Sequence, residues 1–224
     1  MKRLLLGLSA LLMLTSTASA GFLIDPYLGF RFSGEIVEDT NRGDEDEYEF
    51  SGLAYGARVG YDYFGIMFGV EYGMASSDIE QSADPECAGI ANCSVVGKKH
   101  EGDFKNLGIF VGYNVPLMFR VWFTYFLSAE MELTGKTDQT DLGGDTNSTT
   151  TYDGGGYSLG VGYTGLPFLS INLEYKKLTY NEIDFVGAFS ATADLPTSSH
   201  VNFGSRGELD SSEIMLSVSL PLDL

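Results

Sequence analysis

"MFRVWFTYFLSAEMEL", residues 118–133, carries three charged side chains inside one of the most apolar runs of the chain. Every odd position in this stretch is apolar. The even positions are mixed and include Arg120, Glu130 and Glu132. A period of two is typical of a β-strand with two different faces. The stretch therefore predicts an extended strand with one wholly apolar face, and the medium that meets this face decides the class of the protein.

The same alternation recurs in seven further segments, so the sequence predicts eight strands. The connections between them alternate in length, which is typical of an up-and-down meander whose two ends face different compartments. The predicted strands are 24–33, 53–62, 66–75, 106–115, 118–133, 157–163, 169–176 and 213–220. The short connections are 62–65, 115–118 and 164–167, and the long ones are 35–49, 76–104, 134–154 and 178–211.

Three architectures could bury or cover the apolar faces. A soluble barrel or a sandwich would turn them inward, whereas a membrane barrel would turn them outward to lipid. The polar faces are rich in glycine, which weakens a strand that faces water but suits the narrow interior of a barrel of eight strands. The glycines concerned are Gly29, Gly56, Gly60, Gly69, Gly73, Gly108, Gly112, Gly160 and Gly162. The pattern favours an all-β, antiparallel transmembrane barrel.

Aromatic residues on the apolar faces gather near both ends of the predicted strands. Two aromatic belts are typical of a protein that crosses a membrane, because these rings prefer the lipid–water interface. The predicted belt near the short turns contains Tyr61, Tyr63, Tyr113, Phe119, Tyr163 and Phe168. The predicted belt toward the long loops contains Phe32, Tyr72, Tyr157 and Tyr175. Strands of about 9–11 residues would suffice for a tilted crossing.

The first twenty residues have the pattern of a secretory signal peptide. Lys2 and Arg3 precede an apolar run, and small residues lead to a predicted cleavage after Ala20. We therefore expect a leader at 1–20 and a single barrel domain at 21–224. The formal net charge is −18, and loss of the leader makes it more negative by two. Such a charge argues against a nucleic-acid partner.

The chain resembles the small outer-membrane barrels, namely the OmpA-type transmembrane domain and the OmpX-like and opacity-like surface proteins. The resemblance covers essentially all of residues 21–224. It rests on "PYLGFRF" (26–32), on "FRVWFTYFLSAEMEL" (119–133), on the strand tails "VGYD", "VGYN" and "VGYT", and on the last strand. It implies the outer membrane of a Gram-negative bacterium, a monomer without a cofactor, and short turns in the periplasm. The implied partners are membrane lipid and lipopolysaccharide, the barrel-assembly machinery and periplasmic chaperones.

Two features depart from this family. We expect no peptidoglycan-binding domain after the barrel, so the resemblance does not imply anchoring to the cell wall. The last strand ends in Leu224, whereas the family commonly ends in an aromatic residue that the assembly machinery reads.

Charged residues on the polar faces are expected to lie in the lumen. Buried charges need partners, because an unpaired one costs several kcal/mol. We expect Arg31, Arg58, Glu71 and Glu174 to form a central network, flanked by Lys105 with Glu130 or Glu132 and by Lys176 with Glu213. The full predicted set is Arg31, Arg58, Asp62, Glu71, Lys105, Arg120, Glu130, Glu132, Glu174, Lys176 and Glu213.

The lumen has two interpretations. It could be a narrow pore for small solutes that is gated by the charges, or a closed interior in which the charges satisfy one another. The bulky side chains expected inside favour the closed barrel, because eight strands leave room only for side chains. They are Met67, Phe110, Trp122, Phe126 and Met215.

Other chemistry is weakly indicated. Cys87 and Cys93 in an exported chain favour a local disulfide over a metal pair. His200 has Asp194, Ser198 and Ser199 nearby, which leaves a lipid hydrolase as a third hypothesis. His100 has the character of an ordinary loop residue. We expect no catalytic residue and no metal site.

The first long loop is acidic and could hold divalent cations shared with lipopolysaccharide phosphates, or could simply be solvated. It lacks the ligand spacing of an EF-hand. The sequence thus predicts a non-enzymatic barrel with a structural, surface-contact or adhesion role through acidic loops that meet an unidentified extracellular ligand.

Overall fold

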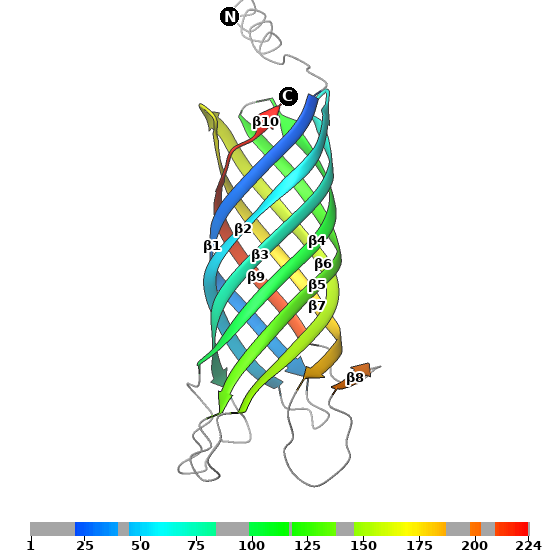
Figure 1. The fold of residues 1–224 in the computed structure, drawn as a ribbon. Helices are drawn as coiled ribbons and strands as arrows, with labels where there is room; N and C mark the ends of the chain where they lie inside the picture. The colour runs from blue at the N-terminus through cyan, green and yellow to red at the C-terminus, as the bar shows by residue number, and fades with distance from the viewer. Residues whose placement is uncertain are drawn as a thin grey trace, which may run out of the picture.

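The strands of the chain close into one antiparallel barrel (Figure 1). The computed structural model describes residues 21–39, 45–83, 99–116, 118–137, 146–186, 198–202 and 209–223. The strands are β1 (Gly21–Asp39), β2 (Glu45–Tyr63), β3 (Ile66–Ala83), β4 (Lys99–Val115), β5 (Phe119–Thr137), β6 (Thr146–Leu166), β7 (Leu169–Val186), β8 (Ser198–Asn202), β9 (Leu209–Ser219) and β10 (Leu222–Asp223).

Each strand from β1 to β7 pairs with the next along the chain, and β9 pairs with both β7 and β1. The eighth position is shared by three pieces, because β8 pairs with the outer end of β7 and β10 continues β9 alongside β1. This confirms the predicted eight-stranded antiparallel barrel. Closure matters in a membrane, because hydrocarbon offers no partner to an unpaired backbone N–H or C=O group.

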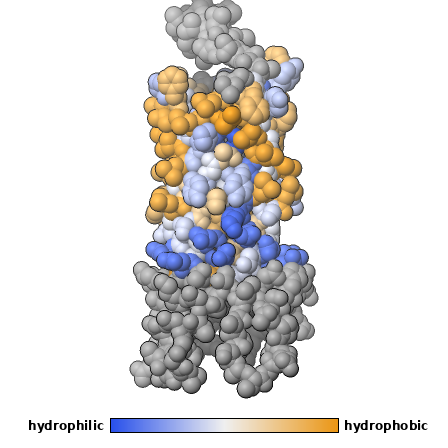
Figure 2. Space-filling view, in the orientation of Figure 1, coloured by the Kyte–Doolittle hydropathy of each residue, from blue (hydrophilic) through white to orange (hydrophobic). Residues whose placement is uncertain are grey.

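In the half of the barrel nearer the short turns, the apolar face of each strand points outward. Leu159 is 54% exposed, whereas Arg58 is 2% exposed and Glu71 is fully buried. Figure 2 shows that apolar side chains gather on the half of the barrel nearer the short turns and hydrophilic ones toward the other end. The polar face therefore encloses the lumen, as the alternation predicts.

The strands are longer than predicted. β1 to β7 contain 17 to 21 residues, whereas a tilted membrane crossing needs about 9–11. The extra residues belong to the segments that the sequence assigned to long loops. In this outer section the alternation is inverted: apolar Ile36, Phe50 and Phe104 face the lumen, and exposed Glu35 and Glu49 face outward. We name the residues beyond the apolar belt the outer section of the barrel.

Bulges carry the inversion in individual strands. In β5 the pairing with β6 shifts between Phe126 and Ala129, and Leu127 and Ser128 are both exposed. In β1 it shifts between Arg31 and Gly34, and Phe32 and Ser33 are both exposed. An extra residue in a strand moves every following side chain to the other face. Apolar residues beyond each bulge are thereby turned into the lumen.

Candidate functional site: the charged interior of the barrel

Arg58 occupies the centre of the lumen and contacts three carboxylates. Its Nε lies 3.2 Å from Oε2 of Glu71, which is directly opposite it in the β2–β3 ladder. Its Nη2 donates to Oε2 of Glu174 on β7 at 2.8 Å, and its Nη1 lies 3.4 Å from Oδ2 of Asp25 on β1. Thr124 donates to Glu71 at 2.6 Å. The cluster thus connects β1, β2, β3, β5 and β7 across the lumen.

Arg120 forms the layer nearer the short turns. Its Nη1 lies 2.9 Å from Oδ2 of Asp25, and its Nη2 donates to Asn172 at 3.0 Å and to Ser219 at 2.7 Å. Asp25 therefore bridges Arg120 and Arg58. The bridge holds β1 to β2 and β5 close to the seam where the last strand closes the barrel.

Glu213 forms the layer on the outer side. It lies 2.9 Å from Nη1 of Arg31 and 3.1 Å from Nζ of Lys176. Arg31 also donates to the hydroxyl of Ser77. All of these groups are buried, and each carboxylate near the centre has at least one cationic neighbour, as a buried charge requires.

Aromatic rings fill the space around the cations. The Cζ of Arg58 lies 4.2 Å from the ring centroid of Trp122 and 4.9 Å from that of Tyr27. The Cζ of Arg31 lies 4.2 Å from the ring of Phe104 and 4.9 Å from that of Phe50. Such cation–π contacts are strengthened where water is excluded. The rings occupy the part of the lumen through which a solute would have to pass.

Glycines make this packing feasible at two places. A Cβ built on Gly160 would lie 2.1 Å from the Trp122 ring, so the indole fits only against a bare backbone. A Cβ on Gly56 or Gly73 would lie 2.6 Å from the hydroxyl of Tyr27. The glycine-rich polar face seen in the sequence therefore makes room for large lumenal side chains.

An apolar cluster, which we name the outer plug, closes the lumen beyond Arg31. Its main members come from seven strands and are buried, and the rings of Phe50 and Phe104 stack with centroids 5.3 Å apart. The main members of the outer plug are Ile36, Phe50, Ile79, Phe104, Met131, Tyr180 and Leu209. The lumen therefore changes from a charged interior to an apolar one at the level of Arg31.

Most of the predicted lumenal residues are brought together by the fold. Arg31, Arg58, Glu71, Arg120, Glu174, Lys176 and Glu213 are buried in the lumen with the contacts given above. Asp62 is also buried, at the end near the short turns, where it accepts hydrogen bonds from the Gly65 backbone N–H at 2.9 Å and from Asn114 at 2.5 Å. Asp62 thus stabilises the β2–β3 turn and its neighbouring strand.

Lys105, Glu130 and Glu132 lie on the outer wall, which differs from the prediction. The β5 bulge at Leu127 and Ser128 turns Ala129 and Met131 inward and both glutamates outward. Lys105 shares the outward face of β4 with Leu107. Its Nζ lies 2.6 Å from Oε1 of Glu130, so the predicted pair forms on the opposite face of the sheet from the one expected.

Asp25 was not among the residues predicted to line the lumen. Its signal was present, since Asp25 falls in the same alternating set as Tyr27 and Arg31 and must point the same way. The lumen, within the described residues, thus holds four cations and five carboxylates, a nearly balanced set.

Two half-buried lysines of the outer wall, Lys105 and Lys177, have carboxylate partners. A hydrogen bond from Lys105 to Glu130 raises the pKa of this lysine, and one from Lys177 to Asp210 raises the pKa of the other. The Nζ of Lys177 lies 3.3 Å from Oδ2 of Asp210. A raised pKa keeps a lysine positively charged around neutral pH, so both lysines partly offset the acids around them.

The remaining candidates lie mostly outside what the structure describes. Cys87, Cys93 and Asp194 fall outside the described residues. The backbone of His200 pairs with that of Asp184 in the β7–β8 ladder, and His100 pairs with Ile79. Within the described ranges, no three His, Cys, Asp or Glu side chains are placed to hold a metal ion.

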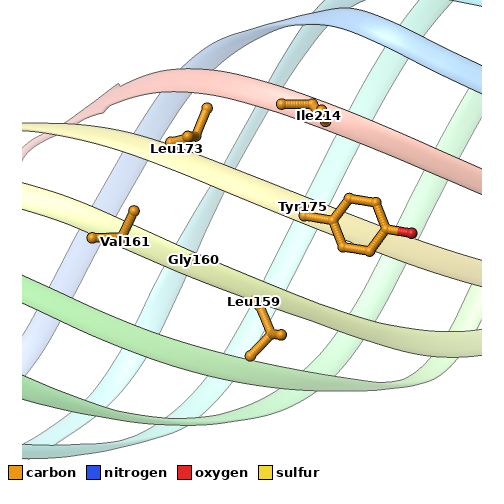
Figure 3. A pocket seen from close by; sticks show the side chains of 6 residues that line it. All are labelled: Leu159, Gly160, Val161, Leu173, Tyr175 and Ile214. Atoms are coloured by element: carbon orange, nitrogen blue, oxygen red, sulfur yellow. The ribbon is translucent and has the colours of Figure 1, made fainter.

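A shallow hollow on the outer wall is apolar. It is lined by Leu159, Gly160 and Val161 of β6, Leu173 and Tyr175 of β7, and Ile214 of β9 (Figure 3). Its side chains belong to the outward apolar face. It contains no group that could perform chemistry, and an acyl chain is the occupant that this face would meet in a membrane.

A closed barrel with an apolar outer belt and a charged lumen is the architecture of a membrane-spanning β-barrel protein. The comparison with known families agrees: the model of the outer membrane protein β-barrel domain matches residues 5–210. The chain belongs to this family. Among the described residues, none forms a helix that is long and apolar enough to cross a membrane.

Solved structures with the same fold share little sequence with this chain. Ail, the attachment invasion locus protein of Yersinia pestis, is 8% identical, with a TM-score of 0.52 over 90% of this chain and 99% of its own. A major outer membrane protein from Thermus thermophilus is 17% identical, with a TM-score of 0.49 over 91% of this chain and 100% of its own. A search of curated protein sequences found no match. At 8% identity, the similarity to Ail establishes the fold alone.

Proposed function

We propose that the protein is a closed, non-enzymatic outer-membrane barrel that acts at the cell surface, where its acidic outer section contacts positively charged partners. The observation that carries this function is the filled lumen. Glu71, Thr124, Ala129 and Met131 are fully buried although their side chains line the interior. A water-filled channel would leave such side chains in contact with solvent.

The outer section supports a role in surface contact. Its outward acids face one another across neighbouring strands: Glu35 opposite Glu49, Asp78 opposite Glu101, and Asp103 opposite Glu132. Like charges directly opposite in a ladder destabilise a sheet. A sheet that keeps three such pairs on a rigid, closed scaffold presents a surface suited to cationic groups of another molecule.

The lumenal carboxylates are unsuited to catalysis in this arrangement. Glu71 and Glu174 are held by Arg58, and Glu213 by Arg31 and Lys176, in the buried interior. They stabilise the barrel by joining opposite walls. We therefore assign a stabilising role to the lumenal ion pairs and the surface-contact function to the outward acids of the outer section.

Two readouts test the two parts of this proposal separately. The wild-type barrel in planar lipid bilayers is expected to give no steady single-channel steps, because the charged layers and the outer plug block the lumen. Stable steps from the wild type would contradict the closed barrel and favour a pore for small solutes.

The second readout is binding of barrels in phosphatidylcholine nanodiscs to immobilised poly-L-lysine at increasing salt. The triple variant Glu35→Gln, Asp78→Asn, Asp103→Asn is expected to bind severalfold more weakly at low salt, and the difference should vanish at high salt because exposed charges are screened. Ser76→Asn in the same section is the matched control without a charge change. Equal binding of the triple variant and the control would overturn the surface-contact role.

A further inference from the structure

The three short turns place bulky apolar residues in a backbone conformation that such residues rarely adopt. Phe64, Met118 and Phe168 have positive φ angles of 52°, 69° and 63°. Non-glycine residues in this region are uncommon, and those that occur are enriched in Asn and Asp. A sterically unfavourable conformation that recurs at three equivalent places indicates that the side chains have a use there.

The residues found in two of these turns differ from those usual for the same backbone conformation. Phe64 and Gly65 are the two central residues of the β2–β3 turn and both have positive φ, a combination for which Asn-Gly is the usual sequence. Pro167 and Phe168 form the β6–β7 turn, and the residue after such a proline is usually glycine or asparagine when its φ is positive. Each turn thus carries a large apolar side chain where its backbone favours a small or polar residue.

These side chains project from the barrel. Phe64 is 61% exposed, Met118 is 58% exposed and Phe168 is 82% exposed. The described turn residues 63–66, 115–116, 118–119 and 164–169 include no charged side chain. Asp62, two residues before Phe64, is buried and accepts hydrogen bonds from the Gly65 N–H and from Asn114. Water would therefore face an apolar rim if the turns stood clear of the membrane.

The apolar belt begins at the turns themselves. On β3 the outward residues from 66 to 74 are Ile66, Phe68, Val70, Tyr72 and Met74, and Ser76 and Asp78 follow. A nine-residue strand tilted by about 40° rises about 23 Å, whereas the apolar band of such barrels is about 25 Å tall. The belt therefore covers the hydrocarbon only if the hydrocarbon begins at the level of the short turns.

We propose that the three short turns are inserted into the inner, phospholipid leaflet of the outer membrane, where Phe64, Met118 and Phe168 anchor the barrel. The surface that they form is continuous with the lipid-facing belt. The turns follow β2, β4 and β6, so they are spread around the end of the barrel where β10 lies (Figure 1). A lipid leaflet surrounds such a rim on every side, whereas a periplasmic protein would contact part of it.

Backbone hydrogen bonds also connect the short-turn end of the barrel to neighbouring strands, which suits an anchor. The Asn114 N–H donates to the carbonyl of Gly65 at 2.7 Å, and the Thr164 N–H donates to the carbonyl of Met118 at 2.7 Å. The β2–β3 turn is therefore held against the end of β4, and the β4–β5 turn against the end of β6. Phe64 packs edge-on against Tyr63 with ring centroids 4.5 Å apart, which orients the ring alongside the aromatic belt.

Tryptophan fluorescence tests the insertion, because the chain has a single tryptophan, Trp122 in the lumen. In a Trp122→Phe background, Phe168→Trp is expected to be quenched by phosphatidylcholine brominated near the carbonyl end of its acyl chains and to be protected from acrylamide. Val161→Trp in the belt is the control for lipid contact, and Ser76→Trp in the outer section is the control for water. Acrylamide quenching of Phe168→Trp that equals the Ser76→Trp value, without quenching by brominated lipid, would overturn the insertion and leave the rim to water or to a periplasmic protein.

A second variant keeps the test valid if Trp122→Phe folds poorly. In the wild-type background, Phe168→Asn suits the positive φ better than phenylalanine does. Insertion predicts a lower urea midpoint for this variant in phosphatidylcholine vesicles, because the lipid contact is lost. A raised midpoint, as expected for simple relief of backbone strain in water, would contradict insertion. Neither readout depends on the outer acids or on conductance, so the anchor and the surface function can fail separately.

Discussion

Arg58 is the side chain on which the charged interior depends most, because Asp25, Glu71 and Glu174 all lie within 3.4 Å of its guanidinium. A planar guanidinium can serve several carboxylates at once, which a lysine ammonium does less well. The central part of this network was predictable, since the charges fall on the polar sets of their strands. Asp25 was predictable for the same reason. Lys105 shares the parity of Leu107, so the alternation itself already assigned it to the outer wall.

Replacement of Arg58 tests the dependence. Arg58→Ala leaves three buried carboxylates without their shared partner, and breaking a buried ion pair from one side costs about 3–5 kcal/mol. We expect a loss of that size in the free energy of unfolding, measured by urea titration of barrels in phosphatidylcholine vesicles, and a smaller loss for Arg58→Lys. Lys105→Ala on the outer wall should change little, because exposed pairs contribute little. Equal stabilities of Arg58→Ala and Lys105→Ala would show that the lumenal network is not needed.

At the scale of elements, the alternation predicted every strand of the membrane crossing but missed the outer section. The reason is physical. In β5 the odd residues 119–133 are apolar throughout, so nothing in the pattern marks the bulge at Leu127 and Ser128. Between the short turn and the bulge the apolar residues meet lipid, and beyond the bulge they meet the outer plug. A pattern that reports apolar and polar residues cannot distinguish these two apolar media, and so Glu130 and Glu132 were placed on the wrong face.

Two outward residues, Leu127 and Ser128, separate the inward Phe126 from the inward Ala129, and this number is expected to be essential. Deletion of both residues gives an unbroken alternation through β5 in which Ala129 follows Phe126 directly, which would turn Met131 outward and Glu130 into the outer plug. We expect the deletion variant to lose the heat-modifiable folded band on gels, whereas Ser128→Ala, which keeps the chain length, should fold normally. A deletion variant that folds as well as Ser128→Ala would mean that the bulge does not set the orientation of the outer section.

The described part of the barrel consists of two stacked sections with opposite exteriors. The section next to the short turns is apolar outside and charged inside, and the outer section is acidic outside and apolar inside. Arg31 lies at their junction, paired with Glu213 and stacked on Phe50 and Phe104 of the outer plug. This division fixes where the membrane ends and leaves the acidic surface in water. The proposed role in surface contact rests on that position rather than on any single residue.

Spin labels on β3 test this division most directly. In a background with Cys87→Ser and Cys93→Ser, a single cysteine is introduced in turn at Val70, at Ala75 or at Ser76 and treated with a spin label. Val70 and Ser76 face outward, whereas Ala75 faces the lumen. We predict that the Val70 label collides with oxygen in the bilayer, that the Ser76 label collides with a water-soluble nickel chelate, and that Ala75→Cys is labelled only after unfolding. Nickel collisions at Val70 together with free labelling at Ala75 in the folded barrel would contradict both the lipid-facing belt and the closed lumen.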